Sequence, residues 1–324
     1  MKTRRLGKTG YEVSEIGLGC WQLGGDFGPV SDETASEILN AADAVGVTFW
    51  DTADVYGNGQ SERRIGAHAK RGDLKVATKL GRSGTLYPDH YSRDGVRASL
   101  VASAERLGVA SLDLAQLHCV PTDVLRDGAI FGWMNEFQAE GLVKHWGASV
   151  ETIEEGMICL EQDGCSTLQI IFNLLRQDAA KALLPKAAKQ DVGIIVRLPL
   201  ASGLLSGKYD KTTTFDATDH RNYNADGQAF SVGETFSGIP FERGVELVAE
   251  LKGLAPERLS MSQFALRWIL DHPEVSTIIA GVSKPAQLAD NVAASEAREL
   301  FPALMEQLGE WYESRVKPEI RGGV

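Results

Sequence analysis

Four ionisable side chains stand at or just beyond the ends of short apolar runs that are typical of buried strands. They are Asp51, Tyr56, Lys79 and His118, and they belong to three successive runs of this kind. Taken singly, Asp51 could cap a turn, Lys79 could be solvated and His118 could be a core imidazole. Their occurrence at corresponding places favours one common site instead.

These four residue types together suit proton transfer to and from a carbonyl oxygen. A tyrosine phenol has an ordinary pKa of about 10, and a nearby lysine ammonium stabilises its phenolate. An aspartate helps to keep the lysine charged away from water, and a histidine N–H can orient the substrate oxygen. The set offers no nucleophile and no source of electrons, so we expect a redox cofactor.

The elements that must position these residues alternate along the chain. The expected strands are 15–20, 47–52, 74–79, 113–118, 143–149, 167–172, 193–198 and 275–280. Helical patterns lie between them at 33–45, 93–107, 124–140, 152–163, 179–189 and 261–271. Parallel strands need such long crossovers. The pattern predicts an α/β fold, a closed (β/α)8 TIM barrel, with its chemistry at the C-terminal strand ends.

Three pieces lie outside this repeat. Residues 1–14 predict a hairpin that turns at Lys8-Thr9-Gly10, and residues 301–316 predict a terminal amphipathic helix. Residues 207–239 are polar and without periodicity, and so long a connection is either functional or disordered. Because it follows the seventh strand, we favour a cofactor or substrate loop, and its order without cofactor is left open. No composition break divides the chain, so residues 1–324 are expected to form a single barrel domain.

Composition and charge limit the class of protein. The 324 residues are 43% hydrophobic and 24% charged, as in proteins with a substantial core, and the formal net charge is −11. This acidic balance argues against nucleic acid or an anionic membrane as the main partner. We see no signal peptide and no membrane-spanning run, and the four cysteines have no zinc-like spacing. We therefore expect a cytoplasmic protein with free thiols and no metal.

The sequence around the four residues resembles that of the aldo-keto reductase superfamily. The matching segments are FWDTADVYG at 49–57, VATKL at 76–80 and AQLHCV at 115–120, and the likeness extends from residues 4–21 to 275–291. The resemblance implies NAD(P)H-dependent interconversion of an aldehyde or ketone with its alcohol, sugars included, by direct hydride transfer. It makes Tyr56 the general acid in reduction and the base in oxidation. Lys79, held by Asp51, would lower the pKa of Tyr56, and His118 would orient the carbonyl.

The resemblance also implies a cofactor site at the barrel mouth. Ser149 and Gln169 match residues that hold the nicotinamide carboxamide, although relatives often carry Asn where this chain has Val150. Arg197 stands where relatives stack an aromatic ring on the nicotinamide. A guanidinium can also stack on a flat ring, and its alternative role is a salt bridge at the rim. The other expected cofactor contacts are Pro199, Leu200, Ser202, Gly203, Leu205, Gly281, Ser283, Lys284, Gln287 and Asn291.

The adenosine end of the cofactor is expected at the start of the helix that follows Pro285. A helix N-terminus favours phosphate through its free N–H groups and its dipole, and Lys284 is the natural partner of a 2′-phosphate. The basic residue that many relatives carry at the place of Gln287 is absent. Lys284 nevertheless favours NADP(H) over NAD(H).

The substrate side carries weaker signals. Trp21, Tyr87 and Cys119 are candidates to line a pocket for a small carbonyl compound or sugar, although aromatic side chains there also pack as core. The sequence defines neither the physiological substrate, nor the favoured direction, nor self-association.

Two other functions compete with an enzyme of this superfamily. The resemblance extends to potassium-channel β-subunits, which keep the four residues but act mainly as cofactor-sensing partners. A metal-dependent hydrolase barrel could use Asp51 and His118, but the other histidines do not supply the third protein ligand that zinc normally takes.

Overall fold

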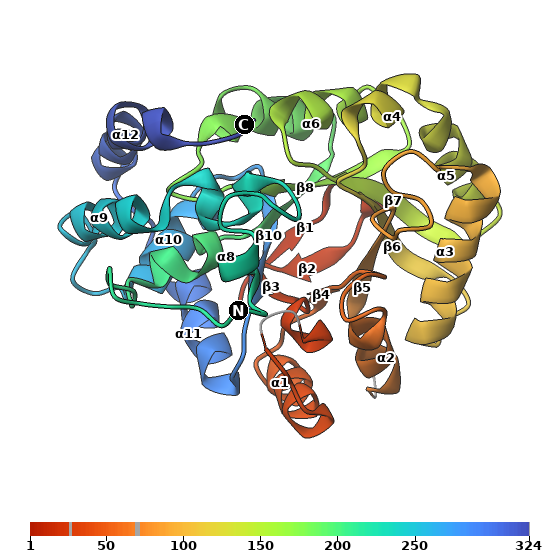
Figure 1. The fold of residues 1–324 in the computed structure, drawn as a ribbon, viewed down its shortest axis with the longest axis horizontal. Coiled ribbons are helices and arrows are strands. Elements are labelled where there is room, and N and C mark those ends of the chain that lie inside the picture. The colour runs from red at the N-terminus through yellow and green to blue at the C-terminus, as the bar shows by residue number, and fades with distance from the viewer. Residues whose placement is uncertain (26–27, 69–71, 324) are drawn as a thin grey trace.

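The predicted barrel class is confirmed by the architecture of the chain. The computed structural model describes residues 1–25, 28–68 and 72–323. Eight parallel strands close into a barrel in the order β10-β3-β4-β5-β6-β7-β8-β9 (Figure 1). The strands are β3 (Ile16–Gly19), β4 (Phe49–Asp51), β5 (Lys75–Leu80), β6 (Leu112–His118), β7 (Val143–Ser149), β8 (Cys165–Ile171), β9 (Gly193–Arg197) and β10 (Val275–Gly281).

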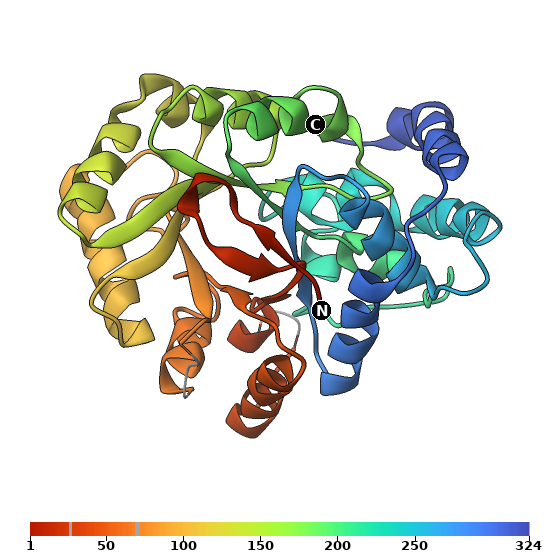
Figure 2. The ribbon, with the colours of Figure 1, turned by 180° about the vertical axis from the view of Figure 1, so that it is seen from behind.

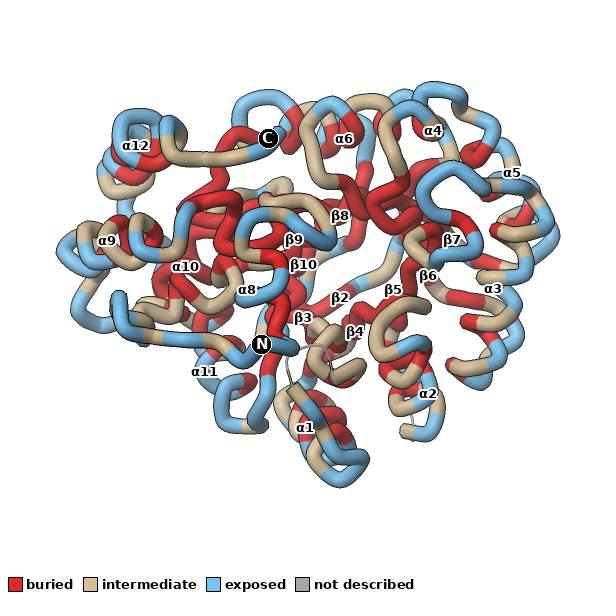
Figure 3. Tube along the Cα trace, viewed as in Figure 1, coloured by how far each residue is buried: buried red, intermediate tan, exposed pale blue. Residues whose placement is uncertain are grey.

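Helices surround this barrel and cover the outer faces of its strands. Buried residues follow the strands, whereas exposed residues lie mainly on the outer sides of the helices (Figure 3). The helices are α1 (Asp32–Ala44), α2 (Gln60–Ala67), α3 (Arg93–Leu107), α4 (Thr122–Asp127), α5 (Ala129–Ala139), α6 (Ile153–Leu160), α7 (Leu183–Lys189), α8 (His220–Tyr223), α9 (Phe241–Lys252), α10 (Met261–Leu270), α11 (Pro285–Glu296) and α12 (Pro302–Trp311). None of the helices in the described ranges is long and apolar enough to cross a bilayer.

Several predicted boundaries were wrong for local reasons. The helix expected at 124–140 is divided into α4 and α5, because Gly128 adopts a left-handed φ of 80° between them. The helix expected at 179–189 begins as a 3-10 turn and becomes α-helical only at Leu183. The polar segment 207–239 contains α8 and two 3-10 turns, at Val232–Glu234 and Phe236–Gly238.

The N-terminal hairpin closes the end of the barrel opposite the catalytic strand ends. Strands β1 (Thr3–Arg5) and β2 (Glu12–Ser14) pair antiparallel, as predicted, and seen from behind they lie across the barrel (Figure 2). Leu6 and Val13 pack in one apolar cluster with barrel residues, among them Phe49, Leu114 and Ile195. This plug excludes water from the lower part of the barrel interior.

Because side chains alternate along each strand, the residues that point into the barrel above this apolar layer can be identified. Phe49 belongs to the inner cluster, whereas Trp50 belongs to the cluster between strands and helices, so Asp51 faces inward again. The same period-two argument places Lys79 above Ala77 and His118 above Leu114. An apolar layer at the bottom is therefore followed by a layer of buried polar groups towards the C-terminal ends of the strands.

The close contact between β7 and β8 depends on a glycine. Gly147 pairs with Thr167, and a Cβ at residue 147 would overlap both the carbonyl oxygen and the hydroxyl of Thr167. We expect Gly147→Ala to lower the free energy of unfolding by about 3 kcal/mol in a urea titration, because backbone must move to admit the methyl group.

The matched control is Gly132→Ala. Gly132 is exposed in α5 and a Cβ there has no neighbour within 4 Å. The control should be neutral or gain up to about 1 kcal/mol from helix propensity. Equal unfolding free energies for the two variants would contradict the packing argument.

Candidate active site

The four predicted catalytic residues meet at the C-terminal end of the barrel around the Lys79 ammonium. Lys79 Nζ donates to a carboxylate oxygen of Asp51, to the carbonyl oxygen of Thr52 at 2.9 Å and to the Tyr56 hydroxyl at 3.2 Å. Lys79 and Asp51 are almost completely buried. A lysine buried this deeply is stable as a cation because each of its three N–H bonds has an acceptor.

Asp51 is held in turn by two side-chain amides from other strands. Gln169 on β8 and Gln116 on β6 donate to its second oxygen over 2.7 and 3.2 Å. Gln169 was predicted as a carboxamide contact, and here it also receives a hydrogen bond from Ser149 over 3.3 Å. Gln116 was missed. Its position two residues before His118 on the same strand face was the available signal.

Two opposing effects set the pKa of Tyr56. Burial raises the pKa of Tyr56, and the Lys79 ammonium opposes this effect without overcoming it. Lys79 therefore acts in the predicted direction, but the net pKa of Tyr56 lies above its ordinary value because desolvation is larger. Burial alone would lower the pKa of Lys79, yet Asp51 and Tyr56 outweigh it and raise that pKa. At neutral pH the pair is a phenol beside an ammonium.

His118 lies next to this pair as a neutral imidazole. Its ring is perpendicular to that of Tyr56, with 5.8 Å between ring centroids. Burial, reinforced by the charges of Arg82, Lys79 and Arg197, holds the pKa of His118 well below its usual range. Its buried Nδ1 has no hydrogen-bond partner within the described part of the chain.

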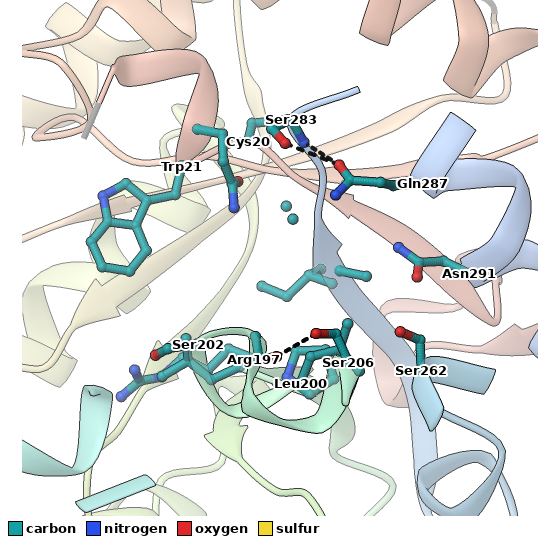
Figure 4. Close-up of a pocket in the computed structure, with 18 of the residues that line it drawn as sticks. Cys20, Trp21, Arg197, Leu200, Ser202, Ser206, Ser262, Ser283, Gln287 and Asn291 are labelled. Carbon is teal, nitrogen blue, oxygen red and sulfur yellow. Dashed lines mark hydrogen bonds between the residues drawn. The ribbon is translucent and has the colours of Figure 1, made fainter. Parts of the chain in front are cut away.

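Asp51, Tyr56 and His118 line one end of an elongated cavity of about 610 Å³, and Lys79 lies behind them. In Figure 4, Trp21 and the guanidinium of Arg197 lie at one end, and Ser262, Gln287 and Asn291 lie towards the other. The predicted residues that line it are Trp21, Asp51, Tyr56, His118, Gln169, Arg197, Pro199, Leu200, Ser202, Gly203, Gly281, Ser283, Gln287 and Asn291. Lining residues that sequence reasoning missed are Gln22, Tyr209, Arg221, Glu234 and Ser262.

Some predicted residues lie beside this cavity rather than on its wall. Leu205 is fully buried within the Ala201–Ser206 turn, Ser149 is buried at the end of β7, and Lys284 is the residue that precedes the first turn of α11. Cys119 is buried and lies 3.5 Å from an Arg197 nitrogen. Tyr87 is 43% exposed in the loop after β5 and is not among the lining residues described.

The segment that follows β9 is bent into an unusual backbone conformation. Leu198, Ala201, Ser202 and Gly203 all have φ between 47° and 94°. Non-glycine residues are rare in this left-handed region, and they persist there where surrounding structure enforces a tight curve. The 3-10 turn Ala201–Ser206 formed by this curve contributes Ser202, Gly203 and Ser206 to the cavity wall.

At the far end of the cavity, α11 begins with a side-chain cap. The backbone N–H groups of Ser283 and Lys284 donate to Gln287 Oε1 over 2.8 and 3.0 Å, and the Ser283 hydroxyl donates to the same oxygen (Figure 4). Gln287 is therefore oriented by the helix start that it lies beside. This arrangement places a positive helix end next to polar amide groups.

Arg197 forms the rim salt bridge, which was one of the two alternatives that its sequence position left open, whereas stacking on a nicotinamide stays a prediction. It lines the cavity, and its guanidinium also pairs with Glu234 at 3.4 Å and donates to the Val150 carbonyl at 3.1 Å. The rim salt bridge thus fixes a cation on the cavity wall beside the reacting groups.

Comparison with known proteins agrees with this fold. Residues 15–313 match the model of the Aldo/keto reductase family. Aldo-keto reductase YhdN of Bacillus subtilis is 30% identical over 298 residues, covering 89% of this chain and 87% of that protein. The structure of glycerol dehydrogenase AKR11B4 from Gluconobacter oxydans superposes with a TM-score of 0.79 at 26% identity, over 100% of this chain and 98% of that chain. The chain belongs to the aldo/keto reductase family, a family of oxidoreductases.

The relatives also include proteins of another class. A protein of Schizosaccharomyces pombe named "Putative voltage-gated potassium channel subunit beta" is 30% identical over 329 residues, covering 95% of this chain and 92% of that protein. Similarity alone therefore does not separate an enzyme from a subunit of this kind.

The state of His118 can be tested by NMR. We expect its imidazole to stay neutral from about pH 5.5 to 8, because burial and three nearby cations oppose protonation. The imidazole signals of His118 are identified as those that are missing from the spectrum of His118→Asn. In the natural chain, the chemical shifts of these signals should not change over this pH range. A titration midpoint at or above about pH 5.5 would contradict the electrostatic account of the site.

Proposed function

We propose that this chain is an NAD(P)H-dependent oxidoreductase that interconverts an aldehyde or ketone with its alcohol, with Tyr56 as general acid and base. The observation that carries the proposal is the Lys79 ammonium, which contacts Asp51 and the Tyr56 hydroxyl at one end of the elongated cavity. A proton alone does not reduce a carbonyl group, so reduction also needs a partner that supplies the hydride.

The cavity residues fit a nicotinamide dinucleotide. The curved segment 198–203 and the start of α11 offer backbone groups for phosphate, and Lys208 and Arg221 add positive charge to the wall. Ser149 and Gln169, which are hydrogen-bonded to each other, would hold the carboxamide next to Tyr56. When bound, the cofactor supplies or accepts the hydride.

The residues of the chain then handle the proton. In reduction, Tyr56 Oη donates its proton to the carbonyl oxygen, and the phenolate left behind lies 3.2 Å from Lys79 Nζ. In oxidation, the same oxygen takes the proton of the alcohol. Because burial keeps the resting phenol protonated, the acid form needed for reduction predominates at neutral pH. His118, which is neutral, can donate a hydrogen bond to the substrate oxygen without adding charge.

The expected substrate is a small carbonyl compound or sugar that reaches Tyr56 past Trp21. The indole of Trp21 stacks on the Tyr56 ring, with 5.7 Å between centroids and an angle of 18°. An apolar face beside the hydroxyl suits the carbon skeleton of such a substrate. NADP(H) is the favoured cofactor because Ser283 and Lys284 provide a hydroxyl and a cation at the α11 start.

A cofactor-sensing subunit remains the second candidate, supported by the likeness to the potassium-channel relative. Both candidates need the dinucleotide site. Multiple turnovers of a carbonyl substrate distinguish them, because a sensing subunit requires no sustained catalysis.

The proton donor can be tested with Tyr56→Phe. We expect kcat to fall by about 10² to 10⁴-fold, the usual value of general acid catalysis, whereas the Kd for NADPH should change by less than about twofold. Loss of absorbance at the nicotinamide band with a panel of aldehydes, ketones and sugars is the assay. Tyr11→Phe, in the hairpin segment behind the barrel, is the control and should retain activity. Full activity of Tyr56→Phe would disprove its role.

Cofactor preference can be tested with Lys284→Ala. We expect the Kd for NADPH to rise about tenfold, which corresponds to about 1.4 kcal/mol, because a 2′-phosphate loses its cationic partner. The Kd for NADH should stay within about twofold, and Lys189→Ala, at the exposed end of α7, should change neither value. Equal weakening of both cofactors would contradict the assignment of Lys284 to a 2′-phosphate.

A further inference from the structure

Two glutamates and two arginines form a cluster beside the catalytic residues, in which Glu234 and Arg197 are buried and Glu151 and Arg82 are half-buried. Arg82, in the loop after β5, donates from one nitrogen to Glu234 at 2.8 Å and to Glu151 at 3.2 Å. Arg197, at the end of β9, pairs with Glu234 at 3.4 Å. The cluster thus joins three barrel strand ends to the 201–239 segment, which carries Glu234.

The two carboxyl groups are close enough to interact directly. Oxygens of Glu151 and Glu234 and the sulfur of Cys119 all lie within 4.8 Å of one another. A hydrogen bond between two carboxyl groups requires one of them to be protonated. Burial alone would raise the pKa of Glu234, but Arg82 and Arg197 hold it at about 2, so Glu234 is the carboxylate. Burial and the Glu234 charge raise the pKa of Glu151 to about 7, so Glu151 is the proton carrier.

The other polar groups around Glu151 contact its backbone or are buried beside it. Arg176 donates to the Glu151 backbone carbonyl at 3.1 Å, and the Glu151 amide donates to Glu155 at 2.9 Å. Cys119 is buried, and its thiol pKa is raised mainly by burial. Cys119, Glu151 and Glu234 also have the spacing of a metal-binding group. We assign no metal to them, because Arg82 already places a positive charge on both carboxyl groups.

The 201–239 segment forms a large part of the cavity wall. Its lining residues are Ser202, Gly203, Ser206, Lys208, Tyr209, Arg221 and Glu234. Glu234 is the member that ties it to the opposite rim, and the neighbouring Phe230 packs against both Arg82 and Trp21. If the bonds of Glu234 are lost, this part of the wall loses its ion pairs with Arg82 and Arg197 and keeps the Phe230 contact with Arg82.

We propose that Glu151 and Glu234 share one proton and act with Arg82 and Arg197 as a latch, which holds the 201–239 segment over the cavity and positions Arg197. Loss of the shared proton places two negative charges side by side and releases the segment. Glu234 and Glu151 are positioning residues, because they act through Arg197 and the segment. The expected change in the rate of cofactor dissociation rests on the proposed function. The pH-dependent attachment of the segment does not.

The direction of the pH effect follows from the raised pKa of Glu151. A group with a raised pKa in the closed state stabilises that state at low pH, and the effect is lost as pH rises through its pKa of about 7. For a carboxyl group that returns to an ordinary pKa of about 4.3 on opening, the opening equilibrium rises about tenfold between pH 6 and pH 8.

The test is hydrogen–deuterium exchange of the protein without cofactor at pH 6 and pH 8, corrected for intrinsic exchange rates. We expect the protection factors of residues 218–236 to fall about tenfold at the higher pH, while those of α5 stay constant. Glu151→Gln, which cannot titrate but keeps a donor, should show equal protection at both pH values. Glu234→Gln should show low protection at both. Glu154→Gln, an exposed neighbour on α6, should retain the response of the natural chain.

Two outcomes would overturn the latch. One is equal protection of residues 218–236 at both pH values in the natural chain, and the other is the same fall in Glu151→Gln. NADPH dissociation, followed by stopped-flow fluorescence, should accelerate with pH in the natural chain and not in Glu151→Gln. A chain that binds no NADPH would contradict the proposed function and would leave the exchange comparison intact.

Discussion

A charged lysine inside a closed barrel is the constraint on which the rest of this structure depends. Removing an ammonium from water costs several kcal/mol unless its charge and all its donors are matched. Asp51, the Thr52 carbonyl and the Tyr56 hydroxyl provide this match for Lys79. Asp51 in turn needs the amides of Gln169 and Gln116, so four strands must meet within hydrogen-bond distance around one point.

The closed sheet satisfies this requirement, and the remaining elements protect it. The hairpin closes the lower end with Leu6 and Val13, whereas the cavity opens onto the polar layer from the other end. The cationic side chains of Lys79, Arg82 and Arg197 lie near this polar layer, although the chain carries a formal net charge of −11. A low dielectric around the cluster strengthens its pairing and also keeps His118 neutral, because further positive charge is opposed there.

Much of this could be predicted because it depends on local pattern. Period-two alternation and the ends of apolar runs located Asp51, Lys79 and His118, and the sequence contexts added Tyr56 and the cofactor residues. Glu234 and Arg221 lie in a polar segment without periodicity, so only tertiary packing brings them to the cavity. Helix α2 is short and charged, with three buried residues, and its pattern was too weak to predict. Lys79 lowers the pKa of Tyr56 as predicted, but the net direction could not be predicted, because burial, which sequence does not quantify, exceeds that effect.

The most direct test of the central claim is the rate of hydride transfer in a single turnover of Lys79→Met. The substitution keeps the side-chain volume and removes only the charge and the donors, and Asp51, whose pKa burial already raises, can take up a proton to remain neutral. The account predicts a rate about 10² to 10⁴-fold lower than that of the natural chain, with the Kd for NADPH changed by less than about threefold and the fold intact by circular dichroism. A folded variant that transfers hydride at the natural rate would contradict it.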